Sequence, residues 1–142
     1  MRKYIKNRYS NICVYAFDKS VHEKQQKAFD LLKNRPVISS QVIIETHNAC
    51  FRKLKLQQPV CEETVLLLTD ICHVVEIKHT TIRTAIVLKR KYCFSFLDSL
   101  IIATALDSKC TILYSEDMHH EQIIENPEKN GARTLTIINP FV

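Results

Sequence analysis

Apolar residues with helical spacing alternate along the chain with short runs of β-branched and aromatic residues. The helical periodicity predicts helices at residues 12–16, 22–34, 41–56, 60–70, 79–91 and 96–106, and a further short helix at residues 119–125. The β-branched runs predict strands at residues 37–39, 73–77, 110–114 and 134–138. Helices that alternate with short buried strands are typical of an α/β domain built around a mainly parallel sheet.

Such a sheet is covered by helices on both faces, so the expected architecture is a three-layer α/β/α sandwich. The chain has 142 residues, enough for one domain with a substantial core, and no repeat, linker or low-complexity tract divides it. We therefore expect a single domain over residues 1–142. Tyr4 and Ile5 are suited to a first strand, but Lys6, Asn7 and Arg8 are poor residues for a buried one, so this strand is expected to be shortened or disrupted.

The stretch Tyr92–His120 contains a predicted helix, a strand and a turn in succession. Ser95 is the expected N-cap of the helix, and Asp98 stands three residues later, where a capping box has its acid. The strand Cys110–Tyr114 is followed directly by Ser115-Glu116-Asp117. Open α/β sheets bind ligands beyond the carboxyl ends of their strands, so these polar residues are candidates for a functional site.

Composition and charge exclude several classes of protein. Gly131 is the only glycine, which argues against a Walker loop or a dinucleotide fingerprint. The six cysteines form no C-x-x-C pair and lie mostly among apolar residues, which favours reduced thiols in a cytoplasmic protein. No apolar run is long enough for a membrane span, so no membrane partner is expected. The formal net charge of +5 mildly favours an anionic partner.

Three acids stand apart from the exposed charges: Glu45, early in a helix that follows a strand, Asp98, and Asp117. In a three-layer sandwich all three positions can meet at one edge of the sheet. Clustered carboxylates repel one another unless a cation lies between them, and Mg²⁺ or Mn²⁺ prefers such oxygen ligands and promotes hydrolytic cleavage of phosphodiesters. Each acid also has an ordinary interpretation: a helix cap for Asp98, an N-cap for Asp117 and a solvated helix residue for Glu45. Spacing alone leaves both possibilities open.

Four segments taken together resemble a PIN domain, and most closely the ribonuclease toxins of VapBC-type toxin–antitoxin modules. The segments are Ser10–Asp18, Ile38–Glu45, Phe94–Ile101 and Leu113–Met118. The resemblance implies a small α/β/α domain that cleaves an RNA substrate with Mg²⁺ or Mn²⁺, binds a cognate antitoxin and forms a homodimer. By motif, Glu45, Asp98 and Asp117 match acids that hold the metal and carry catalysis. The matching polar companions are Asn11 and Ser115, with Glu116 beside them.

The first motif departs from the family pattern, in which an apolar strand ends in Asp-x-Asn. Here the residue two before Asn11 is Tyr9. Either the aspartate is substituted, or residues were lost between Arg8 and Ser10 together with a central strand; the second interpretation fits the polar approach better. We expect weak metal binding and poor RNA cleavage. The alternative is a catalytically inactive protein that retains dimerisation and antitoxin binding.

Basic residues that could contact an RNA backbone are Arg52, Lys53, Lys55, Lys89, Arg90 and Lys91. The ordinary alternative for both clusters is a solvated helix face.

Overall fold

A computed structural model of the chain describes residues 2–5 and 12–142. In this part of the chain the helices are α1 (Ile12–Tyr15), α2 (His22–Lys33), α3 (Ser40–Arg52), α4 (Gln58–Ile71), α5 (His79–Tyr92) and α6 (Phe96–Asp107). The strands are β1 (Arg2–Ile5), β2 (Val37–Ser39), β3 (His73–Val75), β4 (Cys110–Tyr114), β5 (Ile123–Glu125) and β6 (Thr134–Ile138). The predicted α/β class is confirmed.

The strands form one sheet in the order β3-β2-β1-β4-β6-β5. All neighbouring pairs are parallel except β5 and β6, which are antiparallel. Strand β1 lies in the middle, with Tyr4 opposite Val37 of β2 on one side and Leu113 of β4 on the other. The interpretation that a central strand had been lost after Arg8 is therefore wrong: a short central strand is present, and it lies earlier in the chain.

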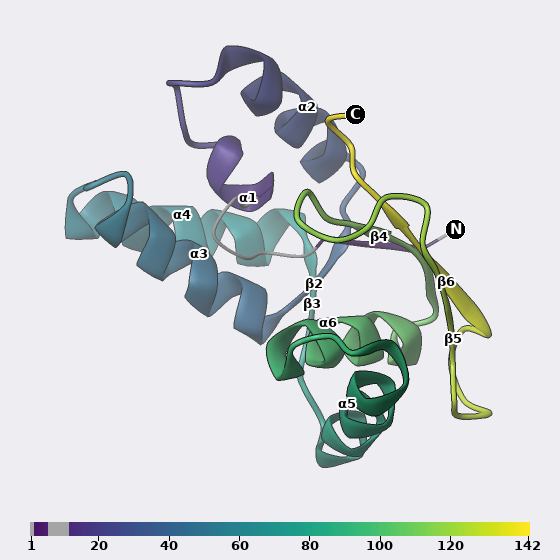
Figure 1. Ribbon diagram of the computed structural model, residues 1–142. Coiled ribbons are helices and arrows are strands. Elements are labelled where there is room, and N and C mark those ends of the chain that lie inside the picture. Colours follow the sequence, from purple (N-terminus) through teal and green to yellow (C-terminus); the bar gives the residue numbers. More distant parts are fainter. Residues whose placement is uncertain (1, 6–11) are drawn as a thin grey trace.

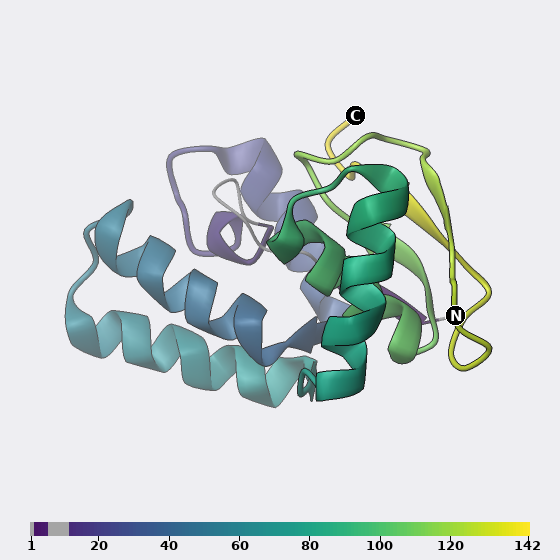
Figure 2. The same cartoon turned by 60° about the horizontal axis from the view of Figure 1, so that its bottom comes forward.

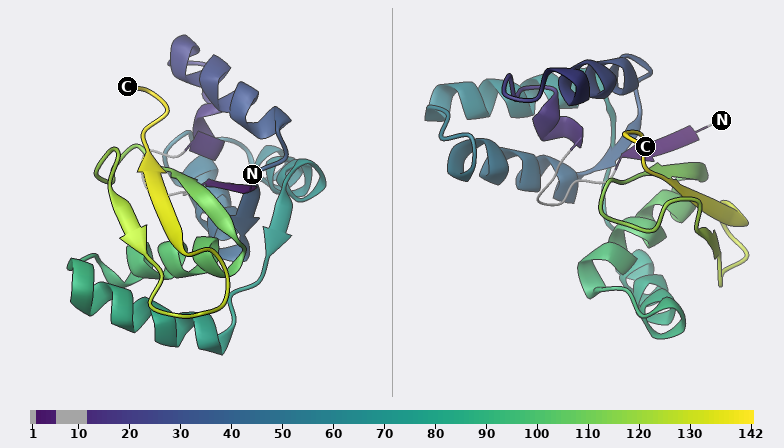
Figure 3. Two further views of the ribbon diagram at one scale, coloured as in Figure 1. Left: turned by 90° about the vertical axis from the view of Figure 1, so that its right-hand side faces the viewer. Right: turned by 45° about the horizontal axis from the view of Figure 1, so that its top comes forward.

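The helices lie in groups around the sheet (Figure 1). The pair α5 and α6 covers one side, and α1 and α2 lie on the opposite side, which gives the expected three layers (Figure 3). Helices α3 and α4 run side by side and project away from the rest of the domain (Figure 2). None of the helices in the described ranges is long and apolar enough to cross a membrane.

Helix α6 is the centre of the core, because every residue from Ser99 to Leu106 is buried. Its apolar residues surround the helix instead of forming one stripe, which is typical of a helix packed on all sides. Burying one large aliphatic side chain such as Ile101 or Leu106 contributes about 1.5–3 kcal/mol, so this helix contributes strongly to stability. The packing places the first turn of α6, with Asp98, at a fixed position relative to the sheet.

Two local features differ from the predicted elements. The helix predicted at residues 41–56 begins one residue earlier, at Ser40, and its N-cap is Ser39, whose side chain accepts a hydrogen bond from the Val42 amide. Residues 119–125 do not form a helix: a turn precedes β5, which pairs with β6 at the sheet edge. The pairing with β6 supplies backbone hydrogen bonds that a short isolated helix would have to make alone.

Candidate active site

Three elements bring the predicted acids to one region of the domain. Glu45 lies in the second turn of α3, which begins where β2 ends. Asp117 follows the end of β4, which is parallel to β2 within the same sheet. Helix α6 runs back along the sheet and then turns directly into β4, so its first turn, with Asp98, lies toward the carboxyl end of β4. The carboxyl edge of the sheet is therefore the candidate active site.

Glu45 is half-buried beside the central strand. The Gln41 side-chain amide donates a 3.0 Å hydrogen bond to Glu45 Oε1. Tyr4 of β1 is completely buried, and this burial raises the pKa of its hydroxyl well above the ordinary value. The Ser39 hydroxyl opposes this rise in pKa, and the Glu45 carboxylate adds to it.

Asp98 occupies the third position of α6, and its backbone N–H donates a 3.1 Å hydrogen bond to Ser95 Oγ. The predicted cap by Ser95 is therefore confirmed. The amide groups of a helix N-terminus carry a partial positive charge, which stabilises a nearby carboxylate anion. The Asp98 side chain is half-buried, and helix α6 fixes its position relative to the sheet.

Asp117 is exposed, and the adjacent Ser115 fixes its side chain. The Ser115 hydroxyl donates a 2.8 Å hydrogen bond to Asp117 Oδ1 and accepts one of 3.3 Å from the Met118 amide. Ser115 itself is only 1% exposed, and its amide donates to the Ile138 carbonyl of β6. The buried Ser115 hydroxyl therefore restrains the Asp117 carboxylate, and the functional role that the motif implies for Ser115 stays a prediction.

Glu116 points toward the helices α1 and α2. Its carboxylate forms an ion pair with Lys24 and accepts a 2.8 Å hydrogen bond from the Tyr15 hydroxyl. The Glu116 carboxylate therefore joins β4 to the α1–α2 segment. Lys24 and Tyr15 were not expected here from the sequence, because they lie 92 and 101 residues away from Glu116 and belong to no recognisable motif.

The described acids alone do not form a compact set of metal ligands. Within residues 2–5 and 12–142, no group of three or more His, Cys, Asp or Glu side chains is close enough together to hold one. Glu45, Asp98 and Asp117 approach the same edge of the sheet without forming a compact ligand set. The first-motif residues Tyr9, Ser10 and Asn11 lie outside the described residues, so their part in the site stays a prediction from the sequence.

Comparisons with known proteins agree with this fold. The DNA-bound VapBC complex of Salmonella typhimurium matches with a TM-score of 0.65 and 14% identity over 99% of this chain and 98% of that chain. VapBC2 of Rickettsia felis, bound to a promoter DNA fragment, matches with a TM-score of 0.61 and 18% identity over 82% and 89%. VapC20 of Mycobacterium tuberculosis, a toxin that cleaves the sarcin-ricin loop, matches with a TM-score of 0.60 and 14% identity over 78% and 86%.

At these identities the likeness to solved structures shows a common fold. Comparison with curated protein sequences gives no significant match. The model of the PIN domain family matches residues 10–125, which is most of the chain and includes all three predicted acids. The chain therefore belongs to the PIN domain family.

Proposed function

We propose that this PIN-domain protein is the toxin-like member of a VapBC-type pair, with a ribonuclease site whose activity is weak or lost. The observation that carries the proposal is the first motif, where Tyr9 stands at the position of the family's aspartate. A second observation, which is separate from position 9, is that the described residues contain no group of three or more His, Cys, Asp or Glu side chains that could hold a metal ion.

Three of the acids that match the family motif are present, so we expect a ribonuclease site with reduced activity and not the complete loss of the site. Glu45, Asp98 and Asp117 would provide the negative charge for Mg²⁺ or Mn²⁺, an ion that in such sites polarises the phosphodiester and activates water. Coulomb attraction weakens with distance and with solvent screening, so three carboxylates that are spread along an edge attract a cation less strongly than four that converge. The expected consequence is weak metal binding with little RNA cleavage.

A non-catalytic role in protein binding is the second candidate. Helices α3 and α4, which project from the domain, expose large apolar side chains: Ile44 is 61% exposed and Leu66 is 62% exposed, with Phe51 and Val60 also exposed. Two of the similar solved structures are VapBC toxin–antitoxin complexes. An antitoxin, or a second copy of the chain in a homodimer, would bury this surface in a cytoplasmic complex.

The test is a comparison of wild type with Asp98→Asn for Mn²⁺ binding by calorimetry and for cleavage of single-stranded RNA. The proposal expects weak Mn²⁺ binding and cleavage near background in both proteins. Rapid cleavage by wild type that Asp98→Asn abolishes would contradict the impairment and show an intact nuclease. Failure of wild type to bind any co-expressed antitoxin encoded beside it would contradict the toxin-like role.

A further inference from the structure

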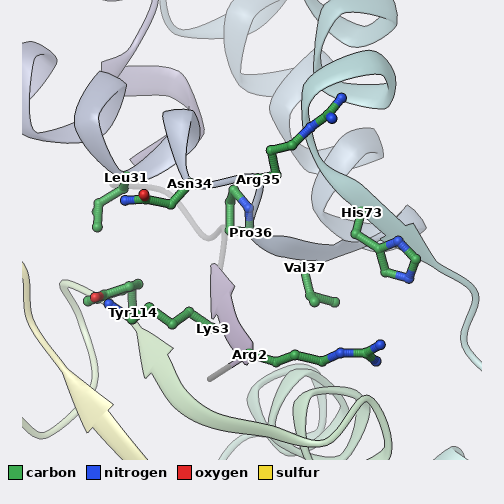
Figure 4. A pocket seen from close by; sticks show the side chains of 9 residues that line it. All are labelled: Arg2, Lys3, Leu31, Asn34, Arg35, Pro36, Val37, His73 and Tyr114. Carbon is green, nitrogen blue, oxygen red and sulfur yellow. The ribbon is translucent and has the colours of Figure 1, made fainter.

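A polar pocket of the domain contains none of the predicted acids among its lining residues. It has a volume of about 410 Å³ and lies beside the amino ends of β1, β2 and β3 (Figure 4). It is lined by Arg2, Lys3, Leu31, Asn34, Arg35, Pro36, Val37, His73 and Tyr114. Pro36 and Val37 are buried. In Figure 4, Lys3 lies beside Tyr114 on one side of them, Arg2 and His73 lie on the other side, and Arg35 extends toward a neighbouring helix.

All ionisable side chains of Arg, Lys and His type that line this pocket are basic, and no acidic side chain lines it. Arg2, Lys3 and Arg35 carry permanent positive charges, His73 adds a further basic group, and no carboxylate is among the lining residues. Throughout residues 2–5 and 12–142, none of these four side chains takes part in an ion pair. Basic residues that line one pocket without acidic residues among them raise its electrostatic potential, which favours an anion.

Contacts with neighbouring groups restrain each of the three cations. An Arg2 Nη1 atom donates a 3.3 Å hydrogen bond to the Ser108 carbonyl, and an Arg35 Nη2 atom donates one of 3.2 Å to the Asp70 carbonyl. The Lys3 ammonium lies over the Tyr114 ring, 5.5 Å from its centre. Each guanidinium has five N–H donors, so most of them stay available after one contact. Restrained cations lose less side-chain entropy when they bind a ligand.

The anion that suits these groups best is phosphate. A guanidinium matches phosphate oxygens with paired hydrogen bonds, and an ammonium supplies a compact charge. An ordinary solvated basic surface would place its cations on a convex face with mixed charges nearby, whereas this pocket is concave and lacks acids. We propose that the pocket binds a phosphate group, carried either by a free mononucleotide or by the backbone of an RNA strand. Because the pocket shares no residue with the acids, this inference is independent of nuclease activity.

The experiment is a titration of the full chain with inorganic phosphate, adenosine 5′-monophosphate and a short single-stranded RNA, followed by amide and His73 ring shifts in NMR spectra. The test variant is Lys3→Gln/Arg35→Gln. The control is Lys27→Gln, which removes one positive charge from an exposed position on α2 outside the pocket. Thermal melting and circular dichroism establish that each variant is folded.

The expected result is a shift of the His73 ring and its neighbours in wild type, with binding weakened at least about tenfold in the double variant and little changed in Lys27→Gln. Binding of all three probes indicates a site for free phosphate compounds, whereas binding of RNA alone with the same variant sensitivity indicates a backbone site. Either result supports the proposal. No binding of any probe, shifts outside the pocket, or equal affinity in the double variant and wild type would overturn it.

Discussion

The Tyr15 hydroxyl donates a 2.8 Å hydrogen bond to Glu116 Oε2, which joins α1 to the segment that follows β4. Lys24 of α2 forms an ion pair with the same carboxylate and lies 4.8 Å from the centre of the Tyr15 ring. Phe141, near the C-terminus, packs edge-on against Tyr15 with the ring centres 5.4 Å apart. This cluster fixes the residue next to Asp117, so one side of the candidate site depends on contacts from both ends of the chain.

The Glu116→Gln variant tests that cluster. We expect the free energy of unfolding to fall by about 1 kcal/mol, because a partly exposed ion pair is lost while a neutral acceptor for Tyr15 remains. The measurement is urea unfolding at neutral pH. Glu128→Gln, in an exposed turn, is the control and should change stability by less than about 0.5 kcal/mol. Equal effects of the two substitutions would show that the Glu116 contacts do not stabilise the domain.

Buried thiols predict a loss of stability at alkaline pH. Burial raises the pKa of Cys50, Cys72 and Cys110 from 9.0 to about 11. The neutral thiols are therefore favoured in the folded state, and their contribution is fully present below pH 9 and is lost as pH rises toward about 11. Urea unfolding at a series of pH values checks this expectation. In Cys72→Ala the decline should be shallower than in wild type, whereas Cys93→Ala, at an exposed cysteine, is the matched control. An unchanged slope in Cys72→Ala would contradict the assignment.

Gly131 is held in a conformation that other residues rarely adopt. Its φ is +88°, and an added Cβ would lie 2.3 Å from the Leu106 carbonyl oxygen at the end of α6. The same carbonyl accepts a 3.0 Å hydrogen bond from the Ala132 amide. We expect Gly131→Ala to lower the melting temperature and to cost about 1–3 kcal/mol of stability. Lys129→Ala in the same turn should have little effect, and a melting temperature for Gly131→Ala equal to that of wild type would refute the close approach.

The sequence was most informative where local rules and tertiary contacts agree. The Ser95 cap, the apolar α6 and the strand Cys110–Tyr114 were all predicted, because capping chemistry and hydrophobic periodicity act over a few residues. The inward face of α5 was harder to predict. Ile82 is a large apolar residue, yet its side chain is 41% exposed, whereas the polar residues Thr81 and Thr84 are buried. The Thr81 hydroxyl bonds to the Asp107 carboxylate, a contact that no local pattern reveals.

Long-range pairing explains the remaining differences. Ile123–Glu125 becomes a strand because β6 is available beside it, although its own residues are too few to specify one. Glu116 was expected near the other acids by position, and only the fold shows that its carboxylate is engaged by Lys24 and Tyr15. The basic pocket was missed entirely, because its basic residues come from three separate segments of the chain.

The most direct test of the central claim, that the missing first-motif carboxylate impairs the nuclease, is RNA cleavage by Tyr9→Asp with Mn²⁺ present. The sheet already contains a central strand, β1, so Tyr9→Asp restores the Asp-x-Asn sequence without the insertion of a strand. Tyr9→Phe is the matched control, and Tyr9→Asp combined with Asp98→Asn tests whether any gain uses the predicted site. The account predicts Mn²⁺-dependent cleavage in Tyr9→Asp that exceeds wild type and disappears in the double variant. Cleavage by Tyr9→Asp no faster than by wild type and Tyr9→Phe would contradict it.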